Sequence, residues 1–142
     1  MSHVTTFRDF LAREFGISIP KDTVLQEQEG VIRAYSKTLM MMKPAGYMGF
    51  VAGKVSTKGI EVKSEFIQLF GKTADRNTIQ LDSSQAAEFV HSDFVQVSQE
   101  GTGLRLAKFG RHVLGVGKLK DGKLHPDFIG KGRKRAENSI KQ

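Results

Sequence analysis

Apolar residues at the start of the chain recur with the spacing of an α-helix that has one buried side. They follow the i, i+3, i+4, i+8 pattern at Phe7, Phe10, Leu11 and Phe15. Thr5 or Thr6 can cap the first turn, and Gly16 supplies the stop. The pattern therefore predicts a helix that ends at Gly16, followed by a connector in which Pro20 interrupts regular structure.

The pattern then changes from a helical period to a strand period. Residues 30–37 alternate between two sets of side chains and are rich in residue types that favour strands. The glycine-interrupted run at 47–63 contains TKG between two apolar segments, which is typical of a β-hairpin. Residues 64–70, SEFIQLF, predict a short helix with Ser64 as its cap and Gly71 as its stop.

The second half of the chain reads as a series of strands after one helix. TIQLD predicts a strand, and the SSQAAEFVHS that follows it predicts a capped helix. The segments FVQVSQ, GLRLAKF, HVLGVGKLK and KLHPDFI come next, separated by the turn signals EGTG, GR and DG. Short strands at a spacing of about ten residues are typical of a small antiparallel barrel or sandwich.

Together these elements predict an α+β protein in two parts. A small α/β domain is expected over residues 1–72 and a mostly β, barrel-like domain over residues 73–135, with a frayed or partly helical tail at 136–142. The chain has 142 residues, of which 39% are hydrophobic and 26% charged, as in packed domains that bury a core without staples.

Composition excludes several classes of site. The chain has no cysteine, so disulfides, thiolate zinc sites and cysteine nucleophiles are absent. The N-terminal residues lack the basic and apolar regions of a signal peptide, and no apolar run approaches the roughly 18 residues that span a bilayer. We therefore expect a cytoplasmic protein without membrane partners.

The net charge of +7 is concentrated near one end of the chain. Residues 1–102 hold 11 basic and 12 acidic residues, whereas residues 103–142 hold 11 basic and 3 acidic ones. Such an asymmetry is the electrostatic footprint of a protein that binds a polyanion. The alternative is a solvated basic face that aids solubility.

The sequence contains no clear residue pattern of a catalytic or metal site. The four histidines show neither an i, i+4 pair nor an acidic neighbour at metal-ligand spacing; they are His3, His91, His112 and His125. LGVGK contains a GxG, but it lies inside an expected strand, where close packing or a bend explains Gly115 and Gly117 better than a nucleotide does. We therefore expect no enzyme activity, no cofactor and no metal.

Binding chemistry remains, because basic residues populate the successive strands, turns and terminal segment that could share a face. Guanidinium groups fork onto phosphates and stack on unpaired bases, which suits structured RNA. The candidate RNA-binding residues are Lys72, Arg76, Arg105, Lys108, Arg111, Lys118, Lys131, Arg133, Lys134 and Arg135. Phe109 and Phe128 could stack bases, or they could face the core.

At these residues the chain resembles a known family. GKTADRNTIQLDSSQAAEFV, the hairpin LGVGKLKDGKL and the closing FIGKGRKR are similar to the C-terminal RNA-binding region of the Sun (Fmu) family of RNA cytosine-5 methyltransferases. They are more similar still to free-standing archaeal relatives, described as ribosome-biogenesis proteins with a PUA-like domain. The resemblance covers about half the chain and includes Ala74 and Asn77 before a strand.

The resemblance implies the RNA-docking part of that family without its catalytic part. The family ending IPKGRR maps onto Lys131, Gly132, Arg133 and Lys134, with Arg135 beyond it, while Gly130 replaces the usual proline. The family's methyltransferases need cysteines and an S-adenosylmethionine domain, and this chain has neither. The implied protein is a non-catalytic one with a PUA-like mixed β-barrel that docks on rRNA or tRNA.

Two other functions compete with this one. A protein-interaction module, such as an accessory subunit that binds a separate RNA methyltransferase or a ribosomal protein, is favoured by the near-neutral first half. Its run Met40–Met42 and its Phe-rich first helix could offer an apolar contact surface. An RNA-modifying enzyme ranks below both, because no acid, base, metal or nucleotide site emerges from the sequence.

Overall fold

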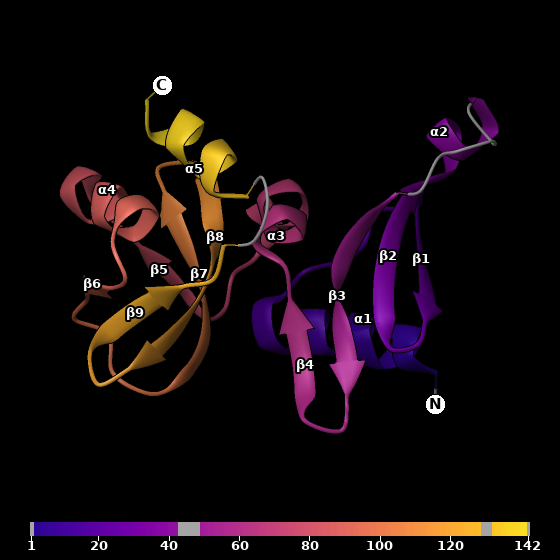
Figure 1. The fold of residues 1–142 in the computed structure, drawn as a ribbon, viewed down its shortest axis with the longest axis horizontal. Coiled ribbons are helices and arrows are strands. Elements are labelled where there is room, and N and C mark those ends of the chain that lie inside the picture. Colours follow the sequence, from indigo (N-terminus) through magenta and orange to yellow (C-terminus); the bar gives the residue numbers. More distant parts are fainter. Residues whose placement is uncertain (1, 43–48, 129–131, 142) are drawn as a thin grey trace.

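The computed structural model describes residues 2–42, 49–128 and 132–141 of the chain. It is a mixed α+β fold with one antiparallel sheet and one mixed sheet, which stand side by side (Figure 1). Helix α3 lies between the two sheets, and helices α4 and α5 cover one side of the second sheet. None of the described helices is long and apolar enough to cross a membrane.

The first sheet, sheet A, is an antiparallel meander in chain order. Its strands are β1 (Thr23–Gln28), β2 (Val31–Ser36), β3 (Phe50–Ser56) and β4 (Gly59–Val62). The strand predicted at 30–37 is confirmed, and so is the hairpin predicted at 47–63 over its described residues, since residues 47 and 48 lie outside the described part of the chain; β1 was not predicted. A two-residue turn joins β1 to β2, and both Glu29 and Gly30 have positive φ, as the favoured hairpin turns require.

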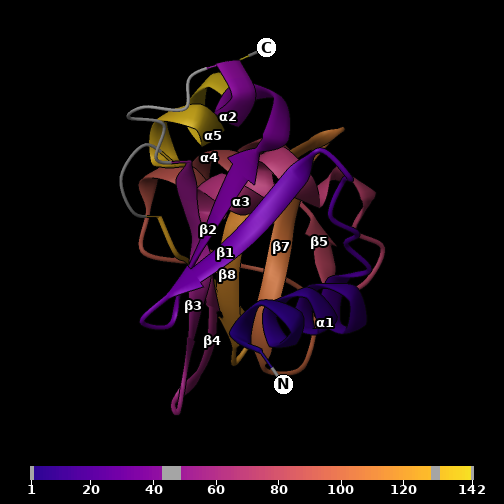
Figure 2. The same cartoon turned by 90° about the vertical axis from the view of Figure 1, so that its right-hand side faces the viewer.

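Helix α1 (His3–Phe15) packs across one face of sheet A (Figure 2). Gly16 ends it in the left-handed conformation, as predicted. The predicted cap was wrong, since the helix begins a turn earlier and Ser2 Oγ accepts the amide hydrogen of Thr5. Phe7 and Phe15 of this Phe-rich helix are fully buried, whereas Phe10 is only partly buried.

The C-terminal end of α1 is closed by residues that lie some sixty positions further along the chain. Arg76 donates hydrogen bonds to the carbonyl oxygens of Ala12 and Arg13. Asn77 Nδ2 donates to the carbonyl oxygen of Glu14 at 2.6 Å. The last carbonyl groups of a helix lack partners within it, so this loop supplies the partners that α1 cannot.

Asp22 lies at the end of sheet A where β2 is followed by the short helix α2 (Lys37–Met42). Its carboxylate accepts hydrogen bonds from the hydroxyl groups of Ser36 and Thr38. These hydrogen bonds, together with Lys37, lower the pKa of Asp22 below its ordinary value. The contribution to stability is therefore present above the ordinary pKa and is lost as the pH falls through the lowered one.

Ser64 joins the two sheets. It was predicted to cap α3 (Ser64–Phe70), but the cap position belongs to Lys63 and Ser64 begins the helix. Ser64 is 3% exposed; its Oγ donates to the carbonyl oxygen of Asp127 at 2.5 Å and accepts the amide hydrogen of Val116 at 3.0 Å. One buried hydroxyl group thus bonds a strand of the second sheet, and the residue that follows another of its strands, to a helix that packs on the first.

Replacing Ser64 with alanine is expected to lower the free energy of unfolding by about 1–3 kcal/mol, because the buried amide of Val116 would lose its partner. Urea denaturation followed by circular dichroism measures this change. Ser84, an exposed serine in α4, is a matched control, and its change to alanine should stay within about 0.5 kcal/mol. Equal effects at the two positions would contradict the role given to Ser64.

The second sheet, sheet B, curls into a half-barrel. Its strands are β5 (Thr78–Gln80), β6 (Val95–Gln96), β7 (Gly103–Phe109), β8 (His112–Lys120) and β9 (Lys123–Pro126). They lie in the order β5-β7-β8-β9-β6; the strands β6 to β9 pair antiparallel, as their spacing predicts, and β5 pairs with β7 in parallel, so the sheet is mixed. Within the described residues β5 and β6 remain edges, which leaves the barrel open.

Gly115 lies where sheet B and α3 approach most closely. A Cβ at this position would lie 2.7 Å from Ser64 Oγ and 2.9 Å from the ring of Phe128. A Cβ at Gly117 would likewise lie 2.9 Å from the carbonyl oxygen of His125. Of the two explanations that the sequence offered for these glycines, a bend or close packing, the contacts at both positions agree with close packing.

Two hydrophobic cores lie on opposite faces of sheet B. The first is shared with α1, α3 and sheet A, and its largest members are Phe7, Phe15, Phe66, Leu11, Ile17, Ile32 and Ile67. The second lies under α4 (Ser83–His91) and α5 (Gly132–Ile140), and its members include Phe89, Leu114, Leu119, Leu124 and Ala136. Sheet B is therefore covered on both sides over much of its area.

Helix α5 replaces the tail that was expected to be frayed or partly helical at 136–142. Ala136 is fully buried, and Ile140 packs against the second core. The predicted barrel end at residue 135 consequently falls inside this helix. The predicted junction at residue 72 falls in the 3₁₀ turn η1 (Gly71–Thr73), between the last strand of sheet A and the first of sheet B.

Candidate nucleic-acid interface

Half of the basic residues singled out in the sequence gather around α5. We call this set the α5 surface; its described members are Lys72, Arg111, Arg133, Lys134 and Arg135. Three of them lie on α5 itself, one lies on η1 next to α3, and one occupies the β7–β8 turn. All five are exposed. Lys131, the remaining member of the predicted cluster, lies outside the described residues.

The α5 surface contains a hollow between α3, β8 and α5. Its volume is about 250 Å³, and Lys72, His112 and Arg135 line it together with the polar side chains of Asn138 and Ser139. The packing of α5 on α4 and sheet B fixes the positions of these groups, because Ala136 is buried beneath the helix. The hollow thus brings cationic and hydrogen-bonding groups from three elements to one place.

The charge of the α5 surface is only partly neutralised. Glu65 lies 3.4 Å from the guanidinium group of Arg135, and this exposed pair is worth little in energy. Arg133 stacks its guanidinium carbon 5.4 Å from the ring centre of Phe128. Among the described residues, no carboxylate lies within ion-pair distance of Lys72, Arg111 or Lys134. Their charges are available to an external anion.

Three other candidates are held by the protein's own groups. Arg76 closes the end of α1, as described above. Lys108 Nζ donates to the carbonyl oxygen of Ala74 at 2.8 Å, and Arg105 Nε donates to Gln99 Oε1 at 2.7 Å. These contacts give the three residues a role in positioning loops, and none of them belongs to the α5 surface.

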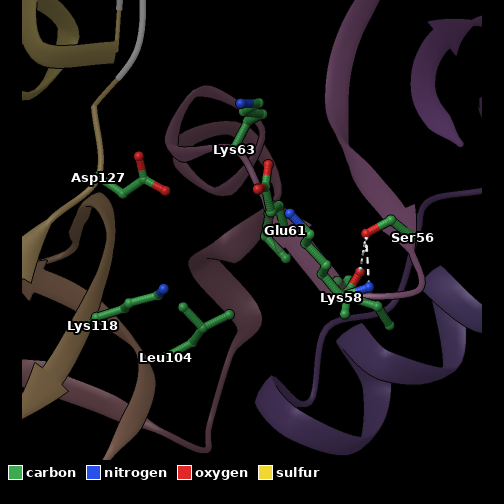
Figure 3. Close-up of a pocket in the computed structure, with 10 residues that line it drawn as sticks. Ser56, Lys58, Glu61, Lys63, Leu104, Lys118 and Asp127 are labelled. Atoms are coloured by element: carbon green, nitrogen blue, oxygen red, sulfur yellow. Dashed lines mark hydrogen bonds between the residues drawn. The ribbon is translucent and has the colours of Figure 1, made fainter.

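Lys118 lies apart from the α5 surface, in a groove between β4 and β8 (Figure 3). The groove has a volume of about 390 Å³ and lies where the edge of sheet A faces sheet B. Lys58, Lys63 and Lys118 border it together with the carboxylates of Glu61 and Asp127. Because it mixes both signs of charge, the groove suits a polyanion less well than the α5 surface does.

The two phenylalanines considered for base stacking pack against the second core. Phe109 is half-buried there, and Phe128 meets Phe89 of α4 edge to face, with ring centres 5.4 Å apart. The alternative that both face the core therefore agrees with the structure. The aromatic ring that sheet B does expose is that of Phe94, which is 38% exposed.

Phe94 was missed, although a signal for it exists in the sequence. In FVQVSQ the alternation that places Val95 and Val97 inward places Phe94 and Gln96 outward. Lys123 Nζ lies 4.6 Å from the centre of the Phe94 ring, and the ring of His125 is 5.9 Å away. An exposed aromatic ring with a cation above it is a common element of nucleic-acid interfaces.

Neither the residue types that bind metals nor comparisons with known proteins identify a function for this chain. Within residues 2–42, 49–128 and 132–141, no three histidine, aspartate or glutamate side chains gather closely enough to hold a metal ion. A scan against models of known protein families and a search of curated proteins found no match to this chain.

Proposed function

We propose that this protein is a non-catalytic RNA-binding protein that docks on structured RNA, such as rRNA or tRNA, through the α5 surface. The observation that carries the proposal is the gathering of Lys72, Arg111, Arg133, Lys134 and Arg135 around one short helix. A role in ribosome biogenesis or RNA modification, and the identity of sheet B as a PUA-like barrel, belong to the same proposal and rest on the sequence resemblance.

The local electrostatics of α5 support a polyanionic partner. The first turn of the helix holds Arg133 and Lys134 and no acidic residue. Cations at a helix N-terminus oppose the helix macrodipole, and each destabilises the helix by about 0.3–1 kcal/mol. A phosphate group placed there offsets both the dipole and the cations. The arrangement is unfavourable in the free protein and favourable in a complex with RNA.

The arginine and lysine side chains of the α5 surface can contact phosphate groups in different ways. The planar guanidinium groups of Arg111 and Arg133 can donate two parallel hydrogen bonds to one phosphate, whereas Lys72 and Lys134 act as point charges. Contacts of this kind fix the position of a helical RNA backbone without reading its sequence. A fold that presents them on three separate elements is suited to the shape of a folded RNA.

The competing function, a protein-interaction module, has less support. Large exposed apolar residues among the described part of the chain are Met41 on α2, Leu69 on α3 and Phe94 just before β6, which are far apart in the sequence. Isolated exposed apolar residues are normal on protein surfaces, and a docking patch is usually contiguous. Recovery of the same protein partner after nuclease treatment would favour this function over RNA binding.

The proposal predicts a strongly salt-dependent affinity for a folded RNA. If about four phosphates are contacted, the affinity for a labelled tRNA or rRNA stem should fall roughly 100-fold between 50 and 200 mM salt. Fluorescence anisotropy measures the dissociation constant at each salt concentration. A nearly constant affinity across this range would refute phosphate docking, and equal affinity for a homopolymer strand would leave only a sticky cationic surface.

A further inference from the structure

Where the β8–β9 hairpin extends beyond the first core, the side opposite the second core carries another group of basic and aromatic side chains, away from α5. Leu119 and Leu124 point into the second core, so their neighbours on β8 and β9 point outward. Lys118 lies directly opposite His125, and Lys120 lies directly opposite Lys123. The outward side of the β8–β9 hairpin is thus built from three lysines and a histidine.

These side chains continue across neighbouring strands as rows. Leu104 of β7 pairs with Lys118, and the β6–β9 register places Phe94 opposite His125. The first row runs across β7, β8, β9 and the start of β6 as Leu104, Lys118, His125 and Phe94. The second row contains Lys120, Lys123 and Gln96. We call the two rows the β8–β9 face; neither row contains an acidic residue, although Glu61 and Asp127 border the neighbouring groove that Lys118 also lines.

A depression opens beside the first row. Its volume is about 370 Å³, and its walls include Leu104, Lys118, Leu119, Lys120 and His125. The walls are apolar although two lysines line them, which means that the lysines contribute their methylene stems and hold their ammonium groups at the rim. Apolar walls with cations at the rim match a planar base attached to a phosphate backbone.

We propose that the β8–β9 face binds two or three unpaired nucleotides of an RNA strand. One base would enter the depression against His125, and a neighbouring base would stack on the exposed ring of Phe94. Lys118, Lys120 and Lys123 would contact the phosphates between them. This proposal rests on the RNA-binding function proposed above and adds a second, chemically different ligand to it.

Dimensions and charge favour this occupant over others. The first row crosses four strands, which at a spacing of about 4.8 Å spans roughly 14 Å, enough for two or three extended nucleotides. Exposed aromatic rings on a sheet, flanked by cations, are a recurrent way to hold unpaired bases. A duplex hides its base faces and would leave both Phe94 and the depression without contacts.

The test uses the full chain and an unstructured RNA octamer that carries the fluorescent base 2-aminopurine, whose emission falls when it stacks. Wild-type protein should bind the octamer and quench it. Phe94→Leu removes the ring and keeps an apolar side chain, so it should weaken binding about tenfold, within the range for one stacked base. It should also abolish much of the quenching, while Phe94→Tyr keeps the ring and should restore both.

Variants that remove charge test the proposed phosphate contacts separately. Replacing both Lys120 and Lys123 with glutamine should lower the salt slope for the octamer by about 1.4, as expected for two single-strand phosphate contacts. The matched control replaces Lys21 and Lys37, two exposed lysines of the other half, and should leave the slope unchanged. Equal effects of the two pairs would overturn the site, as would an affinity for adenosine monophosphate equal to that for the octamer.

A blunt RNA stem separates this proposal from the one it rests on. Phe94→Leu should leave binding of the stem unchanged. If the stem binds but the octamer neither binds nor is quenched, the nucleotide site is wrong and the function of the α5 surface stands. If the octamer binds with dependence on the Phe94 ring but the stem does not bind, docking through the α5 surface is wrong and the nucleotide site stands. Binding of neither RNA overturns both.

Discussion

Exchanging Lys72, Arg133 and Lys134 for glutamine together is expected to weaken binding of a folded RNA about 100-fold at moderate salt. Each cation that contacts a phosphate contributes on the order of 1 kcal/mol or more, and these three have no ion-pair partner in the described part of the chain. The salt slope should fall by about 2 to 3, one unit for each lost contact. Anisotropy titrations at several salt concentrations give both quantities.

The same variant makes an opposite prediction for stability, which separates lost contacts from misfolding. Removing two cations from the first turn of α5 relieves their conflict with the helix dipole, and this offsets the loss of the Arg133 contact with the Phe128 ring, so the melting temperature should stay nearly constant. The control removes the same number of charges at Lys21, Lys37 and Lys54, all exposed in the first half of the chain, and should keep its affinity nearly intact. If both triple variants lose affinity alike, net charge alone accounts for binding.

Replacing Phe66 with alanine is expected to lower the free energy of unfolding by about 3–5 kcal/mol, the usual cost of deleting a fully buried phenylalanine ring. Phe66 contacts three other rings from three elements, with centre distances of 5.9 Å to Phe7, 6.3 Å to Phe50 and 4.9 Å to Phe70. The cavity would therefore open where α1, α3 and sheet A meet. Guanidinium denaturation measures the change.

Leu69 supplies the control for this experiment. It lies on the same helix three residues further on but is 49% exposed, so its change to alanine should cost less than about 1 kcal/mol. A loss at Phe66 no larger than the loss at Leu69 would contradict the assignment of Phe66 to the centre of the first core.

The elements that the sequence predicted well are those with a strong local signal. The stripe of phenylalanines in α1 and its glycine stop are sufficient to place the helix, and the alternation of β7 and β8 around the Gly110–Arg111 turn is sufficient to place that hairpin. Strand β1 was missed because its outer half, Gln26 to Gln28, is polar on both sides at the exposed edge of sheet A.

The remaining differences arise from contacts between distant parts of the chain. α5 has only two apolar residues on its inner side, Ala136 and Ile140, and its polar sequence favours a disordered end until the second core is present to receive them. Ser64 looks like an ordinary cap in the sequence. Its bonds to Val116 and Asp127 arise only because the two sheets meet there.

The candidate site divides in the same way. The sequence shows that Arg76, Lys108 and Arg133 are all basic, but it cannot show which of them the fold already occupies. Arg76 and Lys108 are bonded to backbone carbonyl groups, whereas Arg133 extends from an exposed helix. The sequence therefore shows which residues carry a charge, but only the tertiary contacts decide which of those charges a ligand can reach.

The closure of α1 by Arg76 and Asn77 bears on how the chain folds as it is made. A ribosome releases α1 and all of sheet A before it releases the residues that complete the end of that helix. Chains grow at about 5–20 residues per second, so the completed α1 waits roughly 3–12 s for those hydrogen bonds and the completed sheet A about 1–3 s. During this interval the apolar side of the nascent half is exposed, and it is covered only when β7 and β8 supply Leu106, Val113 and Val116 to the first core.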